Sequence, residues 1–392
     1  MKKMSFSLIF LVFLIVSCGE TTGVEPINKG LAGFAVEFAD DFDLGSPEHR
    51  IKNPEGGIVT KINITAIGYD KKPLTNYKGE IGISMLYGEI DMDNERPAME
   101  NGYLGNIDIK MKNCLDNDRV VVQEVKEHEG DSGHHEPTGK MGVSPVFYTE
   151  VATISAIQSM TKGDNGLSSV FNNRNLTLKD KQMVVIAVIE GGFYLHEVGA
   201  EDYSSIYMYT YSTPYVDDNR EESMFLPVGT LIESANGSVF EFFGFTEMSF
   251  PTFKPVYVNK NGKKELKIDT SLIPAPKNIN NILNDKNEME KHEASLVTVE
   301  NVSVAWFNED DSSYIEYSQF PLETSDGDTI MAQTLYTAPL FNAVAEKPAD
   351  ENSKGLHRYN FTGILKQHTS ARPSTWILVP RDMNDIKCLD CK

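Results

Sequence analysis

The chain has 392 residues, of which 57 are Asp or Glu and 36 are Lys or Arg, so its formal net charge is -21 at pH 7. No long segment is basic. Proteins bind nucleic acid mainly through clustered Lys and Arg side chains that displace counterions from phosphates, so this composition disfavours DNA or RNA as the main ligand. The acidic excess is equally consistent with an exported protein that its charge keeps soluble.

The amino terminus has the pattern of a secretory signal peptide. Lys2 and Lys3 precede an apolar run over residues 9–16, which is too short to span a bilayer. Residues 15–18, Ile-Val-Ser-Cys, resemble the lipobox of bacterial lipoproteins. The resemblance implies a signal peptide over residues 1–17, cleavage before Cys18, and a membrane anchor made of acyl chains on that cysteine. An ordinary secretory signal with a Cys near its cleavage site is the alternative.

The residues after Cys18 predict how and where the protein is anchored. Residues 18–30 are mostly small and polar, which is typical of a tether between a lipid and a first domain. Gly19 and Glu20 do not resemble the Asp-type signal that retains lipoproteins in the inner membrane of some enteric bacteria. We therefore expect an outer-membrane location, with the protein on either the periplasmic or the cell-surface face.

Residues 31–145 contain several short runs in which apolar and polar residues alternate, with turn residues between them. Ile58, Ile62 and Ile64, for example, share one face of a run that has strand periodicity. Short strands without a helical pattern predict a β-sandwich. Residues 64–85, ITAIGYDKKPLTNYKGEIGISM, resemble the start of Ig-like modules in bacterial surface proteins. The resemblance implies an Ig-like β-sandwich over residues 31–145.

Two polar clusters in this region contain side chains that could bind a metal ion. Residues 127–136, EHEGDSGHHE, hold three His and four carboxylates, a set that suits a first-row metal such as zinc. They lack the His-Glu-x-x-His order of a zinc hydrolase, so we predict a solvated polar loop and no metal; the candidate ligands, if one binds, are His128, His134 and His135. Residues 91–95 alternate oxygen ligands but lack the central Gly of a calcium loop, which predicts a charged turn.

Residues 183–253 contain three β-rich runs whose order predicts a small barrel. Turn residues separate the runs: Gly191-Gly192, Thr213-Pro214 and Asn236-Gly237. A strand, a Gly-Gly turn, two further strands, a Val-Gly pair and a last long hairpin resemble the OB-fold. The closest resemblance is to OB-like modules in secreted and surface proteins of Gram-negative bacteria, some of which are attached to extracellular nucleases. It implies an OB-like domain over residues 146–260, but no activity.

Residues 261–392 repeat the same order and predict a second OB-like barrel. Three segments of this region correspond in order to segments of the first barrel: residues 295–306 to 183–194, residues 312–320 to 204–212, and residues 359–366 to 239–247. A short helix is expected within residues 279–295. The complete prediction is an all-β chain: an Ig-like β-sandwich followed by two OB-like small β-barrels.

An aromatic strand within the first barrel is the candidate ligand-binding site. Alternation places one set of side chains inward and the other outward: Ile206, Met208 and Thr210 against Tyr207, Tyr209 and Tyr211. Three aromatic rings on the outer face of one strand are unfavourable in water, so we expect either the neighbouring domain or a ligand to cover them. A second aromatic set nearby is predicted to form barrel core, with a further ligand-binding strip as the alternative: Phe240, Phe242 and Phe243.

Cysteine usage fits export. Cys388 and Cys391 lie too close to the carboxyl terminus to open a thioredoxin-like helix, so a small terminal disulfide, or a link from one of them to Cys114, is expected in an oxidising compartment. Near the same end, Arg381, Asp382 and Asp385 predict a solvated turn held by salt bridges.

The sequence contains no nucleophile elbow, phosphate-binding loop or dinucleotide-binding glycine pattern. We therefore predict a non-enzymatic protein without a cofactor, anchored to the membrane through Cys18, that binds an extracellular protein or glycan. The alternative is OB-type binding of single-stranded nucleic acid, or assistance to an extracellular nuclease, through the same rings. The sequence does not predict an oligomeric state.

Overall fold

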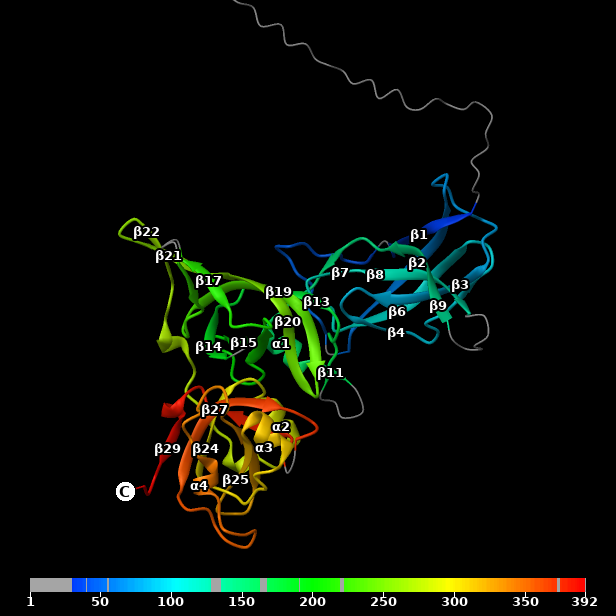
Figure 1. Cartoon of the computed structure of the whole chain (residues 1–392). Helices are drawn as coiled ribbons and strands as arrows, with labels where there is room; N and C mark the ends of the chain where they lie inside the picture. Colours follow the sequence, from blue (N-terminus) through cyan, green and yellow to red (C-terminus); the bar gives the residue numbers. More distant parts are fainter. Residues whose placement is uncertain are drawn as a thin grey trace, which may run out of the picture.

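The computed structural model describes residues 30–39, 41–54, 56–127, 135–162, 168–189, 191–218, 222–371 and 374–391. Strands account for 48% of the chain and helices for 9%, so the predicted all-β class is confirmed. Figure 1 shows strand-rich units following one another from blue to red along the chain. The predicted signal peptide, most of the tether and the lipidation site at Cys18 lie outside the described residues.

The first unit consists of two antiparallel sheets of four strands each. One sheet has the order β1 (Leu31–Phe38), β2 (Ile58–Gly68), β6 (Tyr103–Lys112) and β4 (Glu89–Asp91). The other has the order β5 (Ala98–Met99), β3 (Gly79–Met85), β8 (Val120–Glu127) and β9 (His135–Val143).

The core of this unit follows from the alternation seen in the sequence. Ile58, Ile62 and Ile64 of β2 are buried and pack against β-branched and Met side chains of the other sheet. At one edge β1 and β9 approach so closely that a side chain at Gly142 would meet the backbone of Phe34. The small pair β7 (Asn117–Asp118) and β10 (Phe147–Tyr148) adds Phe147 to the same core.

The second unit is a ring of five strands: β14 (Met183–Ile189), β15 (Gly192–Glu197), β16 (Ser205–Tyr209), β20 (Phe245–Pro255) and β19 (Leu231–Phe242), which returns to β14. All neighbours are antiparallel except β16 and β20. Helix α1 (Ile154–Ser159) contributes Ile154 and Ile157 to the core, and β13 (Asn175–Leu178) pairs with β19. We call this unit the first barrel.

The turn of the last hairpin of the first barrel lies at a different position from the one predicted. The predicted turn at Asn236-Gly237 is wrong, because both residues lie inside β19. The turn between β19 and β20 falls instead at Phe243 and Gly244, whose φ angles are 53° and 87°. Positive φ at both central residues matches the twist of a two-residue hairpin turn. Gly237 marks a register shift, where β20 carries an extra residue opposite β19.

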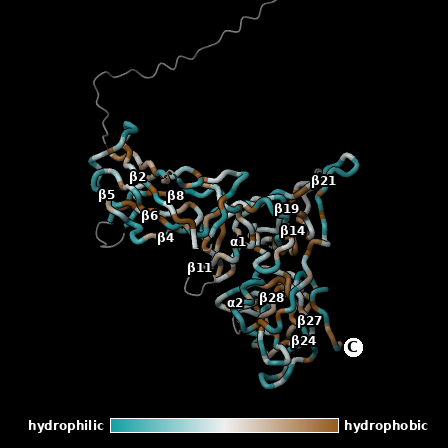
Figure 2. Tube along the Cα trace, turned by 180° about the vertical axis from the view of Figure 1, so that it is seen from behind, coloured by the Kyte–Doolittle hydropathy of each residue, from teal (hydrophilic) through white to brown (hydrophobic). Residues whose placement is uncertain are grey.

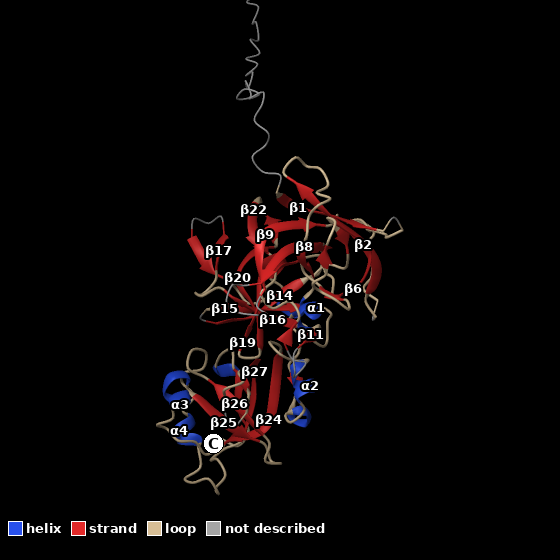
Figure 3. Cartoon of the chain, turned by 90° about the vertical axis from the view of Figure 1, so that its right-hand side faces the viewer, coloured by secondary structure: helices blue, strands red, loops and turns tan. Residues whose placement is uncertain are grey.

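The third unit, which we call the second barrel, closes in the same order. Its ring comprises β24 (Leu296–Val304), β25 (Gln319–Glu323), β26 (Thr329–Gln333), β28 (Trp376–Val379) and β27 (Tyr359–Gln367), which returns to β24. The only parallel neighbours within this ring, all of whose strands are described, are β26 and β28. Three short helices flank it: α2 (Lys286–Glu290), α3 (Ser312–Tyr317) and α4 (Ala343–Glu346). In Figure 3 most of the blue helices surround this unit.

The internal repeat is therefore correct in topology but wrong in one correspondence. Residues 312–317 were expected to match the third strand of the first barrel, and they form α3 instead. Asp311 caps this helix by accepting a hydrogen bond from the Ser313 amide at 2.8 Å, and Tyr314 packs on Phe307 with ring centroids 4.7 Å apart. The third strand of the second barrel is β26.

The remaining elements are short. They are β11 (Thr161–Lys162), β12 (Ser168–Ser169), β17 (Tyr215–Asp218), β18 (Glu222–Phe225), β21 (Tyr257–Lys260), β22 (Lys263–Leu266), β23 (Lys277–Asn278), β29 (Ile386–Cys388), η1 (Thr270–Leu272), η2 (Asn280–Ile282) and η3 (Met383–Asp385). Hydrophobic residues, brown in Figure 2, gather inside each unit. None of the helices in the described ranges has the length and apolar character needed to cross a bilayer.

Candidate ligand-binding surface

The outer face of the first barrel packs against the second barrel, and Tyr207 lies within this junction. Its ring is only 7% exposed and lies 4.8 Å from the Tyr194 ring and 5.8 Å from the Phe245 ring, measured between centroids. Leu296 and Ile364 of the second barrel belong to the same apolar cluster. Burial raises the pKa of the Tyr207 hydroxyl above its usual range. The neighbouring barrel therefore covers this ring.

The other two predicted tyrosines are progressively more open. Ile206 and Met208 point into the barrel core, so Tyr207 and Tyr209 point outward as the alternation requires. Tyr209 is half-buried at the rim of the junction, 6.2 Å from both the Tyr207 and the Tyr211 ring centroids. Tyr211 follows the end of β16 and is 74% exposed.

Sequence reasoning missed a third ring on this surface. Phe250 of β20 is 69% exposed, and its ring centroid lies 5.7 Å from that of Tyr209. Because β16 pairs in parallel with β20, residues far apart in the sequence meet here. The sequence signal that could have found it is an apolar residue directly before Pro251, where the strand alternation breaks. We name Tyr209, Tyr211 and Phe250 the aromatic ridge.

The backbone of the ridge is unusual. Tyr211 has a φ angle of 67° and Phe250 one of 47°, both in the left-handed region that bulky residues rarely adopt. Each such conformation costs on the order of 1–3 kcal/mol and persists where the surrounding structure enforces it. For Phe250 the cause is the bulge opposite Gly237, which turns the ring toward Tyr209. Two exposed rings are thus held in place by strained backbone.

The second aromatic set does not form core, contrary to expectation. Phe240, Phe242 and Phe243 are exposed, because the inward positions of β19 belong to alternate residues such as Val239. The Phe243 ring stacks on His368 of the second barrel at 4.5 Å, and the Phe243 carbonyl accepts a hydrogen bond from the Thr369 amide at 2.8 Å. Phe242 and Phe243 therefore contact the second barrel at one end of the junction, through the ring of His368.

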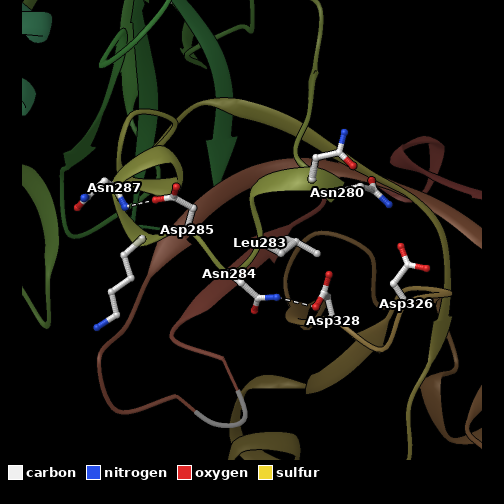
Figure 4. A pocket seen from close by; sticks show the side chains of 9 residues that line it. Asn280, Leu283, Asn284, Asp285, Asn287, Asp326 and Asp328 are labelled. Carbon is white, nitrogen blue, oxygen red and sulfur yellow. Dashed lines mark hydrogen bonds between the residues drawn. The ribbon is translucent and has the colours of Figure 1, made fainter.

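A broad depression lies on the second barrel, between η2, α2 and the turn that joins β25 to β26 (Figure 4). Its volume is about 700 Å³, and amides and carboxylates line most of it. Asn284 donates to Asp328 at 2.6 Å, and Asp285 accepts from the Asn287 amide at 3.0 Å. These polar groups serve the local turns, and the depression offers no aromatic platform.

A second cleft, of about 340 Å³, lies between the two barrels and the segment that links them. His196, His292, Asp202 and Lys277 contribute to its lining. Burial lowers the pKa of His196 to about 4 and also lowers that of His292, so both imidazoles are neutral at pH 7. His196 Nδ1 lies 3.1 Å from the hydroxyl of Ser205, but that serine is fully buried and no substrate can reach it.

The predicted metal candidates divide between described and undescribed residues. His128 and His134 lie outside the described residues, and His135 Nδ1 lies 3.3 Å from a Glu80 carboxylate oxygen. Within the part of the chain that the structure describes, no three His, Cys, Asp or Glu side chains are placed to hold a metal ion. Asp91 pairs instead with Lys112 at 2.7 Å, and this ion pair lowers the pKa of its carboxyl.

The carboxyl-terminal features are structural. Cys388 and Cys391 form a disulfide, and Cys114 is a buried free thiol whose pKa burial raises above its usual range. Arg381 donates two hydrogen bonds of 2.8 Å to the two carboxylate oxygens of Asp385, which stabilises the turn after β28.

Comparison with known proteins adds no relative to this description: no family model and no curated protein matches the chain.

Proposed function

We propose that the protein is a non-enzymatic lipoprotein of the bacterial outer membrane that binds an extracellular glycan or protein through the aromatic ridge. The observation that carries this proposal is the pair of exposed rings, Tyr211 and Phe250, held by strained backbone on either side of Tyr209. Strain kept at exposed aromatic residues costs stability without filling a core, which favours a role in recognition. Aromatic rings stack on sugars and fill protein interfaces at a small entropic cost.

We further propose that the first unit is an Ig-like sandwich and that both rings are OB-like barrels. Two facing antiparallel sheets support the first assignment. The second is supported by the shared strand order, in which the third and fifth strands of each ring are parallel neighbours and the fourth pairs with the first. The lipobox at residues 15–18 supports anchoring through Cys18.

The nucleic-acid alternative is less well supported. In OB-folds the second and third strands form the usual binding face for oligonucleotides. In the first barrel, Tyr194 and Tyr207 on these strands are covered by the second barrel. A net charge of -21 also opposes binding to a polyanion.

The test compares two double variants of the mature chain. Y211S/F250S removes the exposed rings of the ridge, whereas Y215S/F225S removes another exposed aromatic pair, 55% and 58% accessible, from the hairpin of β17 and β18. Binding to a glycan array and recovery of envelope proteins by pull-down are measured for each variant, with thermal melting as the check on folding.

We expect Y211S/F250S to lose binding with an unchanged melting temperature, and Y215S/F225S to bind like the wild type. Equal binding by all three proteins would refute the ridge as the site. Binding of a fluorescent oligothymidine by the wild type, lost in Y211S/F250S, would favour the nucleic-acid alternative instead.

A further inference from the structure

Three glutamates lie together where the two barrels meet, two of them buried and Glu241 half-buried, and neither the fold nor the proposed ligand site uses them. Glu241 belongs to β19 of the first barrel, whereas Glu290 ends α2 and Glu293 lies between α2 and β24. Glu290 is 4% exposed and Glu293 is 1% exposed. The Oε2 atom of each of the three carboxyls is inaccessible to solvent and has no hydrogen-bond partner among the described residues. We call these three residues the carboxyl cluster.

The other oxygens tie the cluster to both barrels. Glu241 Oε1 accepts hydrogen bonds from the Thr246 hydroxyl at 2.6 Å and from the Ser169 amide at 2.8 Å. Glu293 Oε1 accepts a hydrogen bond from the Thr246 amide at 3.1 Å, so β20 of the first barrel contacts both carboxyls. A change in charge on these carboxyls therefore acts directly on the contact between the barrels.

The groups around the cluster do not neutralise it. From β20 comes another carboxylate, Glu247, and from α1 comes the neutral Gln158, which hydrogen-bonds Glu293. Lys366 of β27 interacts with Glu247. No salt bridge within the described ranges joins a Lys or Arg to any member of the cluster.

The remaining neighbours of the carboxyl cluster also supply no positive charge to balance it. On α2 itself, Lys291 pairs with the more exposed Glu288 at 2.6 Å. Tyr194 of β15 faces Glu293, and its hydroxyl remains neutral because burial raises its pKa well above its usual range. Buried carboxylates without a cation are strongly disfavoured relative to the neutral acid. Burial accordingly raises the pKa of Glu290 to about 8, and burial together with the Glu290 charge raises that of Glu293 well above its usual range.

A bound cation could also offset the charge of the buried carboxylates, but the described side chains are not placed as a set of three metal ligands. We propose that Glu290 and Glu293, beside Glu241, hold protons that keep the two barrels docked, and that loss of these protons in mildly alkaline medium loosens the junction. Each deprotonation breaks an O–H bond, releases a proton to water and leaves a carboxylate whose charge repels its neighbours. The junction is thus a pH-sensitive joint between two domains, independent of the aromatic ridge.

The sign of the pH dependence follows from the raised pKa. An unfolded Glu loses its proton near 4.5, whereas Glu290 in the folded chain keeps its proton up to about pH 8. The stability contributed by the neutral acid is therefore fully present below the unfolded pKa and is lost as the pH rises to the folded value. Replacing Glu290 by Gln, which has the shape of the neutral acid and cannot ionise, should remove this loss.

The experiment measures the melting temperature of the wild type, E290Q and E290Q/E293Q across this pH range. The melting temperature of E290Q should exceed that of the wild type by an amount that grows from pH 4.5 to about pH 8. E288Q is the matched control, because it removes a partly exposed carboxylate from the same helix, and the difference between its melting temperature and that of the wild type should not follow this course.

A second measurement does not depend on any variant. The radius of gyration of the wild type, from small-angle scattering, should increase between about pH 6 and about pH 9, because ionisation separates the barrels. Melting curves of E290Q and wild type that stay parallel across the range, with a constant radius of gyration, would overturn the proposal. So would a rise in melting temperature of the wild type on adding Ca²⁺ at pH 8 that E290Q abolishes, because that result assigns the cluster to a cation.

Discussion

Replacing Tyr207 by Ala is the sharpest test of how the two barrels are joined. Its ring is 7% exposed and packs on Tyr194, Phe245 and the apolar side chains of the second barrel. Truncating a buried aromatic residue to Ala costs about 3–5 kcal/mol, because apolar contacts are lost and a cavity remains. Taking roughly 3 kcal/mol, and about 2–4 °C per kcal/mol for a unit of this size, the melting temperature should fall by about 6–12 °C.

Tyr211→Ala is the matched control, because Tyr211 lies just beyond the end of the strand that holds Tyr207. Because Tyr211 is 74% exposed, its loss should change the free energy of unfolding by no more than about 0.5 kcal/mol. Differential scanning calorimetry of the mature chain gives both values under identical conditions. Similar small shifts for the two variants would refute the conclusion that the second barrel covers Tyr207, and would return that ring to the candidate ligand site.

Two further predictions concern the anchor and the helix α3. Cys18→Ala should move the protein from the membrane fraction to the soluble fraction, because the acyl chains that the lipobox implies can no longer be attached; a variant that still sediments with outer membranes would contradict the lipoprotein assignment. Asp311→Ala should lower the free energy of unfolding by about 1 kcal/mol in a urea titration, because the Ser313 amide loses its cap, whereas Asp310→Ala should have little effect. Equal midpoints for these two variants would show that the cap does not stabilise the protein.

Local patterns in the sequence were enough to predict most of the longer strands. The alternation in residues 58–66 and 205–209 reflects one buried and one outward face, a property that each strand carries in its own residues. The same alternation correctly predicted that Ile206 and Met208 point inward and that Tyr207 points outward. The lipobox is a linear motif, so its prediction does not depend on the fold.

Local patterns misled where two local preferences competed. Asn236-Gly237 is a strong turn signal, but the chain turns at Phe243-Gly244, and Gly237 is used for a bulge. Residues 312–317 have strand-forming Tyr and Ile, but the cap from Asp311 and the packing of Tyr314 favour a helix. At Gly237 the pairing with β20 decides between two conformations, whereas for α3 the decision comes from the cap and from a ring seven residues earlier.

The sequence by itself determined the all-β class, the repeated strand order of the barrels and the alternation of the inward Ile206 and Met208 with the outward Tyr207, because these depend on residues that are neighbours along the chain. Only the tertiary structure decided what covers each ring. It placed Tyr207 beneath the second barrel, brought Phe250 to Tyr209, and brought Glu241 close to the buried Glu293. These contacts join residues 40 or more positions apart, and such pairings depend on how whole units pack, which no local pattern of side chains encodes.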